Sequence, residues 1–361
     1  MIIDPQRALA DIRIRVQGDL TQFLGKQTTY LSEIGAELVP AAEAMNSFLL
    51  DSGKRLRPLF AYAGYLASGG TDDESIITAV ASLELLQACA LIHDDLMDGS
   101  DTRRGKPAMH RHFESIHRSR ELSGSAIGYG ASAAILLGDL ALVWSDQMFH
   151  NSGISDAALL RSLAVHDEMR VELMAGQFLD IHEQALATQS VARSLKIARY
   201  KSGKYTIERP LHFGAALASA DPHHLQTMCE IFSDFGLPLG EAFQLRDDIL
   251  GVFGDPSATG KPAGDDLREG KRTVLMAMTH DRADAHQEAV ISTYFGDPDL
   301  TAEGVEKLRT VIAETGAQSH VEELIEKLTI TSLESLNRDE IDSNSRNLLT
   351  ELASSAVRRS L

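Results

Sequence analysis

An acidic pair at the end of an apolar helical run is the feature that most constrains this chain. The run is LELLQACALIHDDLMDGSDTRRGKP, residues 83–107, and its helix is predicted to stop at Gly99. Asp94 and Asp98 lie about 40° apart around such a helix, one turn along it, so they face the same way. The like charges repel by roughly 0.2–0.5 kcal/mol and meet the negative end of the helix dipole, and a bound divalent cation would reverse both penalties.

The residues alone leave two interpretations of this motif open. It is a solvated acidic turn, or it is a set of carboxylates that hold Mg²⁺ beside basic side chains that hold phosphate. A second motif favours the metal interpretation: GEAFQLRDDILGVFGDPSATGK, residues 240–261, also ends an apolar run in an aspartate pair, Asp247 and Asp248. We therefore predict one diphosphate held between facing helices through several Mg²⁺ ions.

Composition excludes several classes of protein. The 361 residues are 43% hydrophobic, which is ample for a core, and the net charge of −18 argues against a nucleic-acid-binding protein, which needs a basic face. Two cysteines, Cys89 and Cys229, are typical of a reduced, cytoplasmic protein without a disulfide framework. The N-terminal segment has an early Asp and no apolar core of a signal peptide. No window approaches twenty uncharged apolar residues, so we predict no transmembrane segment.

The periodicity of apolar residues is helical along most of the chain. Helices are predicted over residues 4–24, 29–50, 58–68, 107–120, 124–149, 156–187 and 222–251, and again from residue 284 onward. The T-x-x-E sequence at residues 71–74 predicts a capping box for the helix that carries the first acidic motif. With no strand-period segment and no low-complexity linker, the fold class is predicted to be all-α, as one domain over residues 1–361.

Two further groups of polar residues have a structural and a functional interpretation. His110, His112 and His117 could ligate a metal, but their spacing points them to different faces of a helix, so we expect surface histidines. Gln177 and Asp180 share a helix face, where they either satisfy each other or support a metal site from behind its ligands.

The ordered motifs GKRLRP, DDLMD, RRGKP, GQFLD, KSGKYT, FQLRDD and GKPAGDDLREGKRT resemble those of the trans-isoprenyl diphosphate synthases, the polyprenyl synthetase family. They occupy a core of about residues 50–280. The resemblance implies a single-domain helical bundle of the isoprenoid synthase type with a central cavity, commonly a homodimer. It also implies a Mg²⁺-dependent prenyltransferase that condenses isopentenyl diphosphate head-to-tail with an allylic diphosphate.

The same resemblance assigns roles to matching residues. About three Mg²⁺ ions per active site would be ligated by Asp94, Asp98 and Asp247, with support from Asp95 and Asp248. The allylic diphosphate and the reacting carbons would be contacted by Arg103, Lys201, Ser202, Gln244 and Lys261. Isopentenyl diphosphate would be bound by Gly53, Lys54, Arg57, Gln87 and Arg104.

Three residues depart from the family pattern. Gly251 replaces the third aspartate that many members have in the second motif, so the metals there must depend on Asp247. Gln87 stands where many members have a His, and Ser202 replaces the usual Thr but keeps the hydroxyl. An amide still donates to a phosphate oxygen, so we expect function to be retained.

The product is predicted from the residues that precede the first motif. Cys89 and Ala90 are small, and with Leu86 they would line a pocket for the growing tail, which favours a C20 product, geranylgeranyl diphosphate. The alternatives are a farnesyl or longer-chain synthase, a terpene cyclase, a head-to-head condensing enzyme, or a non-catalytic regulatory subunit. The basic set Lys54, Arg57 and Arg104 disfavours a cyclase, which binds no second diphosphate.

Overall fold

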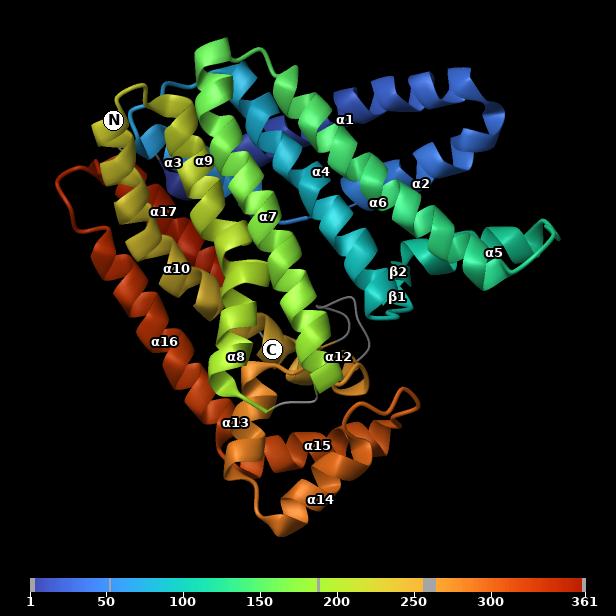
Figure 1. The fold of residues 1–361 in the computed structure, drawn as a ribbon. Helices are drawn as coiled ribbons and strands as arrows, with labels where there is room; N and C mark the ends of the chain where they lie inside the picture. Colours follow the sequence, from blue (N-terminus) through green and yellow to red (C-terminus); the bar gives the residue numbers. More distant parts are fainter. Residues whose placement is uncertain (1–3, 52, 187–188, 256–263, 359–361) are drawn as a thin grey trace. The chain divides into compact units, whose positions relative to one another are not determined.

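The structure is a computed structural model that describes residues 4–51, 53–186, 189–255 and 264–358. The described residues are predominantly helical, which confirms the all-α prediction (Figure 1). They form two compact units, each assembled from segments that are separated in the sequence. Unit 1 comprises the described parts of Met1–Ala164, Pro210–Gln226 and Asp342–Leu352. Unit 2 comprises the described parts of Val165–Arg209, Thr227–Ile341 and Ala353–Leu361.

Unit 1 contains the first acidic motif. Its elements are α1 (Pro5–Ile34), the 3₁₀-helix η1 (Ala36–Leu38), α2 (Val39–Leu50), α3 (Leu56–Ala67), α4 (Glu74–Met97), β1 (Thr102–Arg103), β2 (Lys106–Pro107), α5 (Met109–Ser119), α6 (Ala126–His150), most of α9 (Arg209–Ala218) and much of α17 (Ser343–Val357). Asp4 caps α1 by accepting from the backbone N–H of Gln6, as expected of an Asp-Pro start.

The predicted break between residues 24 and 29 is wrong, because α1 is continuous through Gly25. Glycine inside a helix costs roughly 1 kcal/mol relative to alanine. The helix nevertheless continues because Leu20, Leu24 and Leu31 are all buried on one face. Burial of each such side chain contributes about 1.5–3 kcal/mol, so the packed face outweighs the local cost.

Helix α4 is the core helix of unit 1. Its cap is Asp73, whose side chain accepts from the backbone N–H of Ser75, so the predicted capping box at residues 71–74 is wrong. Asp73 has the extended backbone conformation that a capping residue needs. The predicted stop is confirmed: Gly99 has φ 69°, and the N–H of Ser100 donates to the carbonyl of Asp95 at 2.9 Å.

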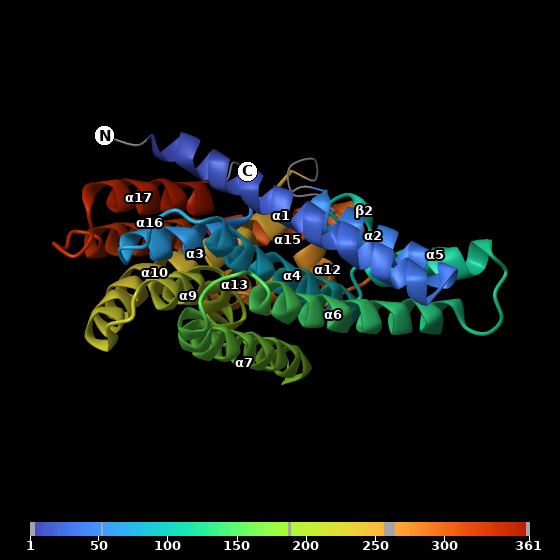
Figure 2. The same cartoon turned by 90° about the horizontal axis from the view of Figure 1, so that it is seen from above.

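Helices α4 and α6 run side by side within unit 1 (Figures 1 and 2). Small residues allow this close contact: a Cβ added to Gly138 would lie 2.1 Å from Nε2 of His93. The Ser145 hydroxyl also donates to the carbonyl of Ser82 at 2.9 Å. The packing fixes one side of α4 firmly, so the motif at its end has a rigid support.

A short hairpin, made of two strands of two residues each, follows α4. It was not predicted from the sequence. β1 pairs antiparallel with β2, with Thr102 opposite Pro107 and Arg103 opposite Lys106. Arg104 and Gly105 form the turn, with φ values of 54° and 74°. Two positive φ values are typical of a type I′ turn, which matches the twist of the flanking strands. The RRGKP sequence is therefore a turn that presents two adjacent arginines.

Unit 2 contains the second acidic motif. Its elements are most of α7 (Asp156–Leu186), α8 (Val191–Ile197), the π-helix η2 (Ala198–Glu208), most of α10 (Pro222–Phe253), α12 (Asp265–Arg268), α13 (Val274–Arg282), α14 (Ala285–Tyr294), α15 (Ala302–Glu314) and α16 (Ala317–Ser335). α8, η2 and α9 follow one another without a break, so the KSGKYT motif lies in a π-helix that periodicity did not reveal.

Two of the described helices, α4 and α6, are long and apolar enough to cross a membrane by length and composition alone. The most apolar window of α4 is 72% buried, as expected of a helix in the core of its unit. The corresponding window of α6 is only 28% buried. Helix α6 thus has an apolar face that its own unit leaves uncovered.

Candidate active site

One face of α4 stays partly open although the middle of the helix is otherwise buried. Between Ala79 and Ile92 the described residues that are not buried are Gln87, Ala90 and Leu91. Asp94 and Asp98 continue the same face toward the end of the helix. The residues predicted to bind substrate and metal on α4 therefore share one accessible stripe.

Arg103 of the hairpin reaches back to the first acidic motif. Its Nε donates to both carboxylate oxygens of the buried Asp95 at 3.0 Å, and its Nη2 also contacts Asp95. The same Nη2 lies 3.7 Å from Oδ2 of Asp94. A buried carboxylate that accepts two guanidinium bonds fixes the arginine in place. Asp95 therefore orients Arg103 and offsets part of its charge, whereas Asp94 and Asp98 remain on the accessible face.

A group of arginines gathers at the turn of the hairpin. Arg104 is exposed as a residue, but partial desolvation of its guanidinium lowers the pKa of that group below its usual range. The charges of Arg103, Arg55 and Arg57 lower it further, while Glu84 opposes them. Like charges held together in this way are costly unless an anion joins them. The group is thus suited to bind an anion with more than one negative charge, such as a diphosphate.

The residues of GKRLRP have different surroundings. Arg55 is buried, has φ 53°, and donates to Glu84 at 2.6 Å and to the carbonyl of Leu49 at 2.6 Å, so it is a structural residue. Lys54 is exposed and Arg57 is half-buried. A Cβ added to Gly53 would lie 3.1 Å from Nη1 of Arg55, so this glycine also makes room for the buried ion pair.

The second acidic motif lies on α10 in unit 2. Asp248 is buried and accepts a hydrogen bond of 2.8 Å from Nε2 of Gln244, whereas Asp247 is half-buried. Burial raises the pKa of Asp248 to about 8, despite the bond from Gln244. The carboxylates of Asp266 and Asp247 also raise it, and Lys271 opposes them. Crowded carboxylates of this kind are what a divalent cation relieves.

Asp266 is a residue of this group to which the sequence analysis gave no role. A Cβ built on Gly251 would lie 1.9 Å from its Oδ2, so the Asp266 carboxylate occupies the space beside the glycine that replaces the third aspartate. The sequence did contain a signal for this role, because Asp266 lies inside the motif GKPAGDDLREGKRT. Its proximity to residue 251 depends on how α12 folds back, which the spacing does not reveal.

Lys201 and Ser202 lie on η2 and are half-buried. Nζ of Lys201 donates to Oδ2 of the buried Asp180 at 2.6 Å. Asp180 therefore pairs with a lysine rather than with Gln177. Lys261, the last of the predicted cations, lies outside the described residues.

The donor set fits Mg²⁺. Among the described residues, no group of three or more His, Cys, Asp or Glu side chains is arranged to hold a metal ion by itself. Mg²⁺ keeps several waters and is bound by one or two carboxylates together with substrate phosphates. The pair Asp94 and Asp98, beside arginines that suit a diphosphate, is therefore the kind of site that Mg²⁺ and a diphosphate would complete together.

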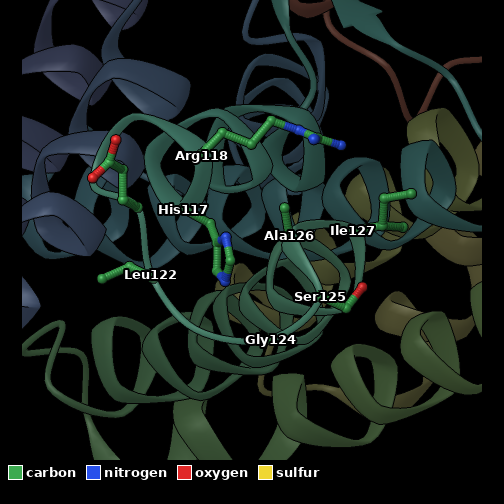
Figure 3. Close-up of a pocket in the computed structure, with 8 residues that line it drawn as sticks. His117, Arg118, Leu122, Gly124, Ser125, Ala126 and Ile127 are labelled. Carbon is green, nitrogen blue, oxygen red and sulfur yellow. The ribbon is translucent and has the colours of Figure 1, made fainter.

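The prediction of surface histidines is wrong for two of the three. His110 and His117 are buried, and Nε2 of His117 lies 3.1 Å from the carbonyl of Ser123. His117 also lines an open depression at the turn from α5 to α6 (Figure 3). No residue of this depression belongs to the predicted metal or substrate residues, so we assign it no part in the chemistry.

Comparison with known proteins shows which sequences and structures this chain is similar to. The polyprenyl synthetase family model matches residues 40–313. Geranylfarnesyl diphosphate synthase of Aeropyrum pernix is 32% identical over 85% of this chain and 90% of its own. Geranylgeranyl diphosphate synthase of Mycobacterium tuberculosis is 31% identical over 73% of this chain and 69% of its own. The solved geranylgeranyl pyrophosphate synthase of Corynebacterium glutamicum, complexed with isoprenyl diphosphate and magnesium, is 42% identical with a TM-score of 0.92, covering 99% of this chain and 100% of that one.

Proposed function

This chain belongs to the polyprenyl synthetase family and is a prenyltransferase with the helical fold of that family, and from this premise we propose that it forms geranylgeranyl diphosphate by adding isopentenyl diphosphate to a shorter allylic diphosphate. One observation carries the proposal. The accessible stripe of α4 presents Asp94 and Asp98 beside the arginine group of the hairpin, so carboxylates for Mg²⁺ and cations for diphosphate occur in one unit.

The proposed reaction has three steps. The allylic C–O bond breaks and leaves an allylic cation and diphosphate; the double bond of isopentenyl diphosphate attacks the cation; and a proton leaves to the released diphosphate. Bound Mg²⁺, about three ions per site, would supply Lewis-acid stabilisation of the leaving diphosphate. In unit 1 Asp95 holds Arg103, and in unit 2 Asp180 holds Lys201. Each of these two cations is a proposed ligand of the allylic diphosphate, and a cation already held in place stabilises developing charge without reorganising.

The other cations serve the second substrate. Lys54, Arg57 and Arg104 bind the diphosphate of isopentenyl diphosphate, and the Gln87 amide donates to it from α4. A chain that makes only one cation and cyclises it needs no second diphosphate site, so this cation set supports a synthase over a cyclase. Lys261, although outside the described residues, is proposed to complete the grip on the allylic diphosphate.

Product analysis tests this function. The purified protein is incubated with Mg²⁺, labelled isopentenyl diphosphate and allylic primers of C5, C10, C15 and C20 length. We expect a C20 diphosphate from the shorter primers. A C15 or C25 product would correct the chain length, cyclised hydrocarbons would identify a cyclase, and no product with any primer would indicate a non-catalytic subunit. A C25 product is a specific alternative, because the Aeropyrum pernix relative is a geranylfarnesyl diphosphate synthase.

The side chain at position 90 of α4 should limit the length of the product. Ala90 lies on the accessible stripe of α4, whereas Leu86 and Cys89 are fully buried. Ala90→Phe should therefore shorten the main product by at least one five-carbon unit, because its ring would block the tail of the growing chain. Cys89→Phe should act in the same direction but adds an overpacking cost of about 1–3 kcal/mol. Chromatography of the dephosphorylated products checks this, and an unchanged length for Ala90→Phe would place the tail elsewhere.

A homodimer is the assembly we propose. Ile127, Ile135, Leu136 and Val143 of α6 are 61%, 49%, 67% and 60% exposed. In unit 2, α7 likewise exposes Val171, Met174, Phe178 and Ile181. Apolar stripes of this size mark interaction surfaces in soluble proteins. They also account for the low burial of α6 without a membrane, which agrees with a cytoplasmic protein whose cysteines form no disulfide in the described part of the chain.

Leu136→Glu should dissociate that dimer. A symmetric interface carries each substitution twice, so the loss is about twice the 1.5–3 kcal/mol of one buried leucine, a weakening on the order of 100-fold or more. Light scattering over a dilution series gives the measurement. Ile330→Glu on α16, where the side chain is 50% exposed, is the control and should leave the mass unchanged. An undiminished dimer for Leu136→Glu would show that α6 is not the interface.

A further inference from the structure

The eleven residues of η2, Ala198–Glu208, are all in π-helix. At its end the N–H of Arg209 donates to the carbonyl of Lys204, five residues back. π-helices are rare, occur mostly as single turns, and are frequent at functional sites. A segment of this length is therefore held by its surroundings, and the surroundings of η2 within unit 2 show how.

Two glycines, one on α7 and one on α10, allow the backbones of these helices to pack directly against the backbone of η2. A Cβ added to Gly176 of α7 would lie 2.4 Å from the backbone N and 2.7 Å from Cα of Lys201. A Cβ added to Gly240 of α10 would lie 2.6 Å from Cα of Gly203. Backbone atoms cannot move aside as a flexible side-chain end can, so any side chain at either glycine would push η2 away. The π-helix is thus confined between α7 and α10.

A single carboxylate of α7 bridges one π-turn of this segment. Oε1 of Glu172 accepts from Nζ of Lys204 and, at 2.9 Å, from Nη2 of Arg209, and its Oε2 accepts from Nε of Arg209 at 2.6 Å. Lys204 and Arg209 are the two residues joined by the five-residue backbone bond. In an α-helix residues five apart point about 140° away from each other, so one carboxylate could not readily reach both. The Glu172 bridge therefore matches the π register and opposes the α register.

The bridge is shielded from water and further supported. The side chains of Glu172, Lys204 and Arg209 are 13%, 13% and 11% exposed. Glu208 lies 3.6 Å from Lys204 through Oε2 and accepts from the Ser233 hydroxyl at 2.6 Å. Burial alone would raise the pKa of Glu172, but the hydrogen bonds from Arg209 and Lys204 hold it below its usual range. Charged groups paired in such a setting interact more strongly than on the surface.

We propose that Glu172 is a positioning residue for the condensation: by bridging Lys204 and Arg209 it locks η2 in the π register and so sets where Lys201 meets the allylic diphosphate. Lys201 lies three residues before Lys204, and a change of register would rotate it away from Asp180, the partner that holds its Nζ at 2.6 Å. The proposal deepens the function proposed above and rests on it for the identity of the ligand. It does not require Glu172 to touch substrate.

Glu172→Gln tests this role, because the amide keeps the size of the side chain but loses the charge and one of the two acceptor oxygens. We expect the KM for the allylic diphosphate to rise about 10-fold, with the KM for isopentenyl diphosphate within about 2-fold of the wild-type value. Hydrogen exchange of the backbone amides between residues 204 and 209 should become about 10-fold faster. Gly176→Ala adds a Cβ that would press on the backbone of η2. It should also raise the KM for the allylic diphosphate and speed up exchange of the amides between residues 204 and 209.

Glu168→Gln is the matched control. Glu168 contacts Arg209 at 2.7 Å, but its side chain is 53% exposed and no bond from it to Lys204 is present among the described residues. The same chemical change without the bridge should leave both KM values and the exchange rates near wild type. If Glu172→Gln behaves like this control, or raises both KM values equally along with a general rise in exchange, the positioning role is overturned. The exchange readout needs no substrate, so a wild-type protein that lacks prenyltransferase activity would overturn the proposed function separately.

Discussion

Asp94→Ala should lower kcat by at least about 10³-fold while leaving the melting temperature at or slightly above that of the wild-type protein. If Asp94 holds the cation beside the leaving diphosphate, as proposed, its loss removes several kcal/mol of stabilisation from the transition state, and each 1.36 kcal/mol is a factor of ten. The fold has little to lose, because Asp94 and Asp98 are like charges in the last turn of α4, where the helix dipole also disfavours them.

Initial rates at saturating Mg²⁺ and a thermal unfolding curve measure the two effects. Asp101→Ala is the control, since Asp101 lies just after the motif, has a 71% exposed side chain and pairs with Arg111 at 2.6 Å. It should keep its activity within a few-fold of wild type. A near-normal rate for Asp94→Ala would refute the metal assignment, and a large fall in melting temperature would show that the carboxylate serves the fold.

The parts of the site that could be predicted from the sequence depend on contacts between residues close in the chain. The stop at Gly99 follows from a single turn of backbone, and the common face of Asp94 and Asp98 follows from helix periodicity alone. Both are confirmed. The accessible stripe of α4 also follows the period of that helix, although the sequence does not say which face its neighbours leave open.

The predictions that failed concern features that depend on residues far apart in the chain. The π register of η2 is held by Glu172, which is 32 residues from Lys204 and 37 from Arg209. The burial of His110 and His117 depends on the return of α6 along α5, where a Cβ on Gly130 would lie 2.2 Å from the carbonyl of His110. Tertiary contacts of this kind override local preference, and periodicity carries no record of them.

Asp95 illustrates an intermediate case. The family resemblance placed it within the motif as a support for the metal ligands, and its immediate partner is Arg103, eight residues later in the first strand of the hairpin. An arginine paired with an aspartate either loses its charge effect or stays available to a phosphate, and burial of the pair decides which. Asp95 is fully buried. The pairing thus fixes the orientation of Arg103, which we propose as a diphosphate ligand, and spacing alone could not show this.

Gly251→Asp should lower kcat by about 10²-fold, although it restores the third aspartate that many members of the family carry. A Cβ at residue 251 would lie 1.9 Å from Oδ2 and 2.5 Å from Cγ of Asp266, so the new side chain would displace that carboxylate. Asp266 is close enough to raise the pKa of Asp248 and lies 3.6 Å from Lys271. Removal of one preorganised group from a catalytic site, such as an oxyanion-hole donor, typically costs about 10²–10³-fold in rate, and we expect a loss at the lower end of that range here.

Two further variants separate displacement of Asp266 from simple crowding. Gly251→Ala should also lower kcat, with little change in melting temperature, because the obstacle is the end of a side chain that can move aside. If Asp266 supplies the carboxylate that Gly251 lacks, Asp266→Ala should lower kcat by a similar factor, and the double variant with Gly251→Asp should recover part of the loss. If Asp266→Ala is as active as the wild-type protein, the carboxylate only fills space, and the second motif works with Asp247 and Asp248 alone.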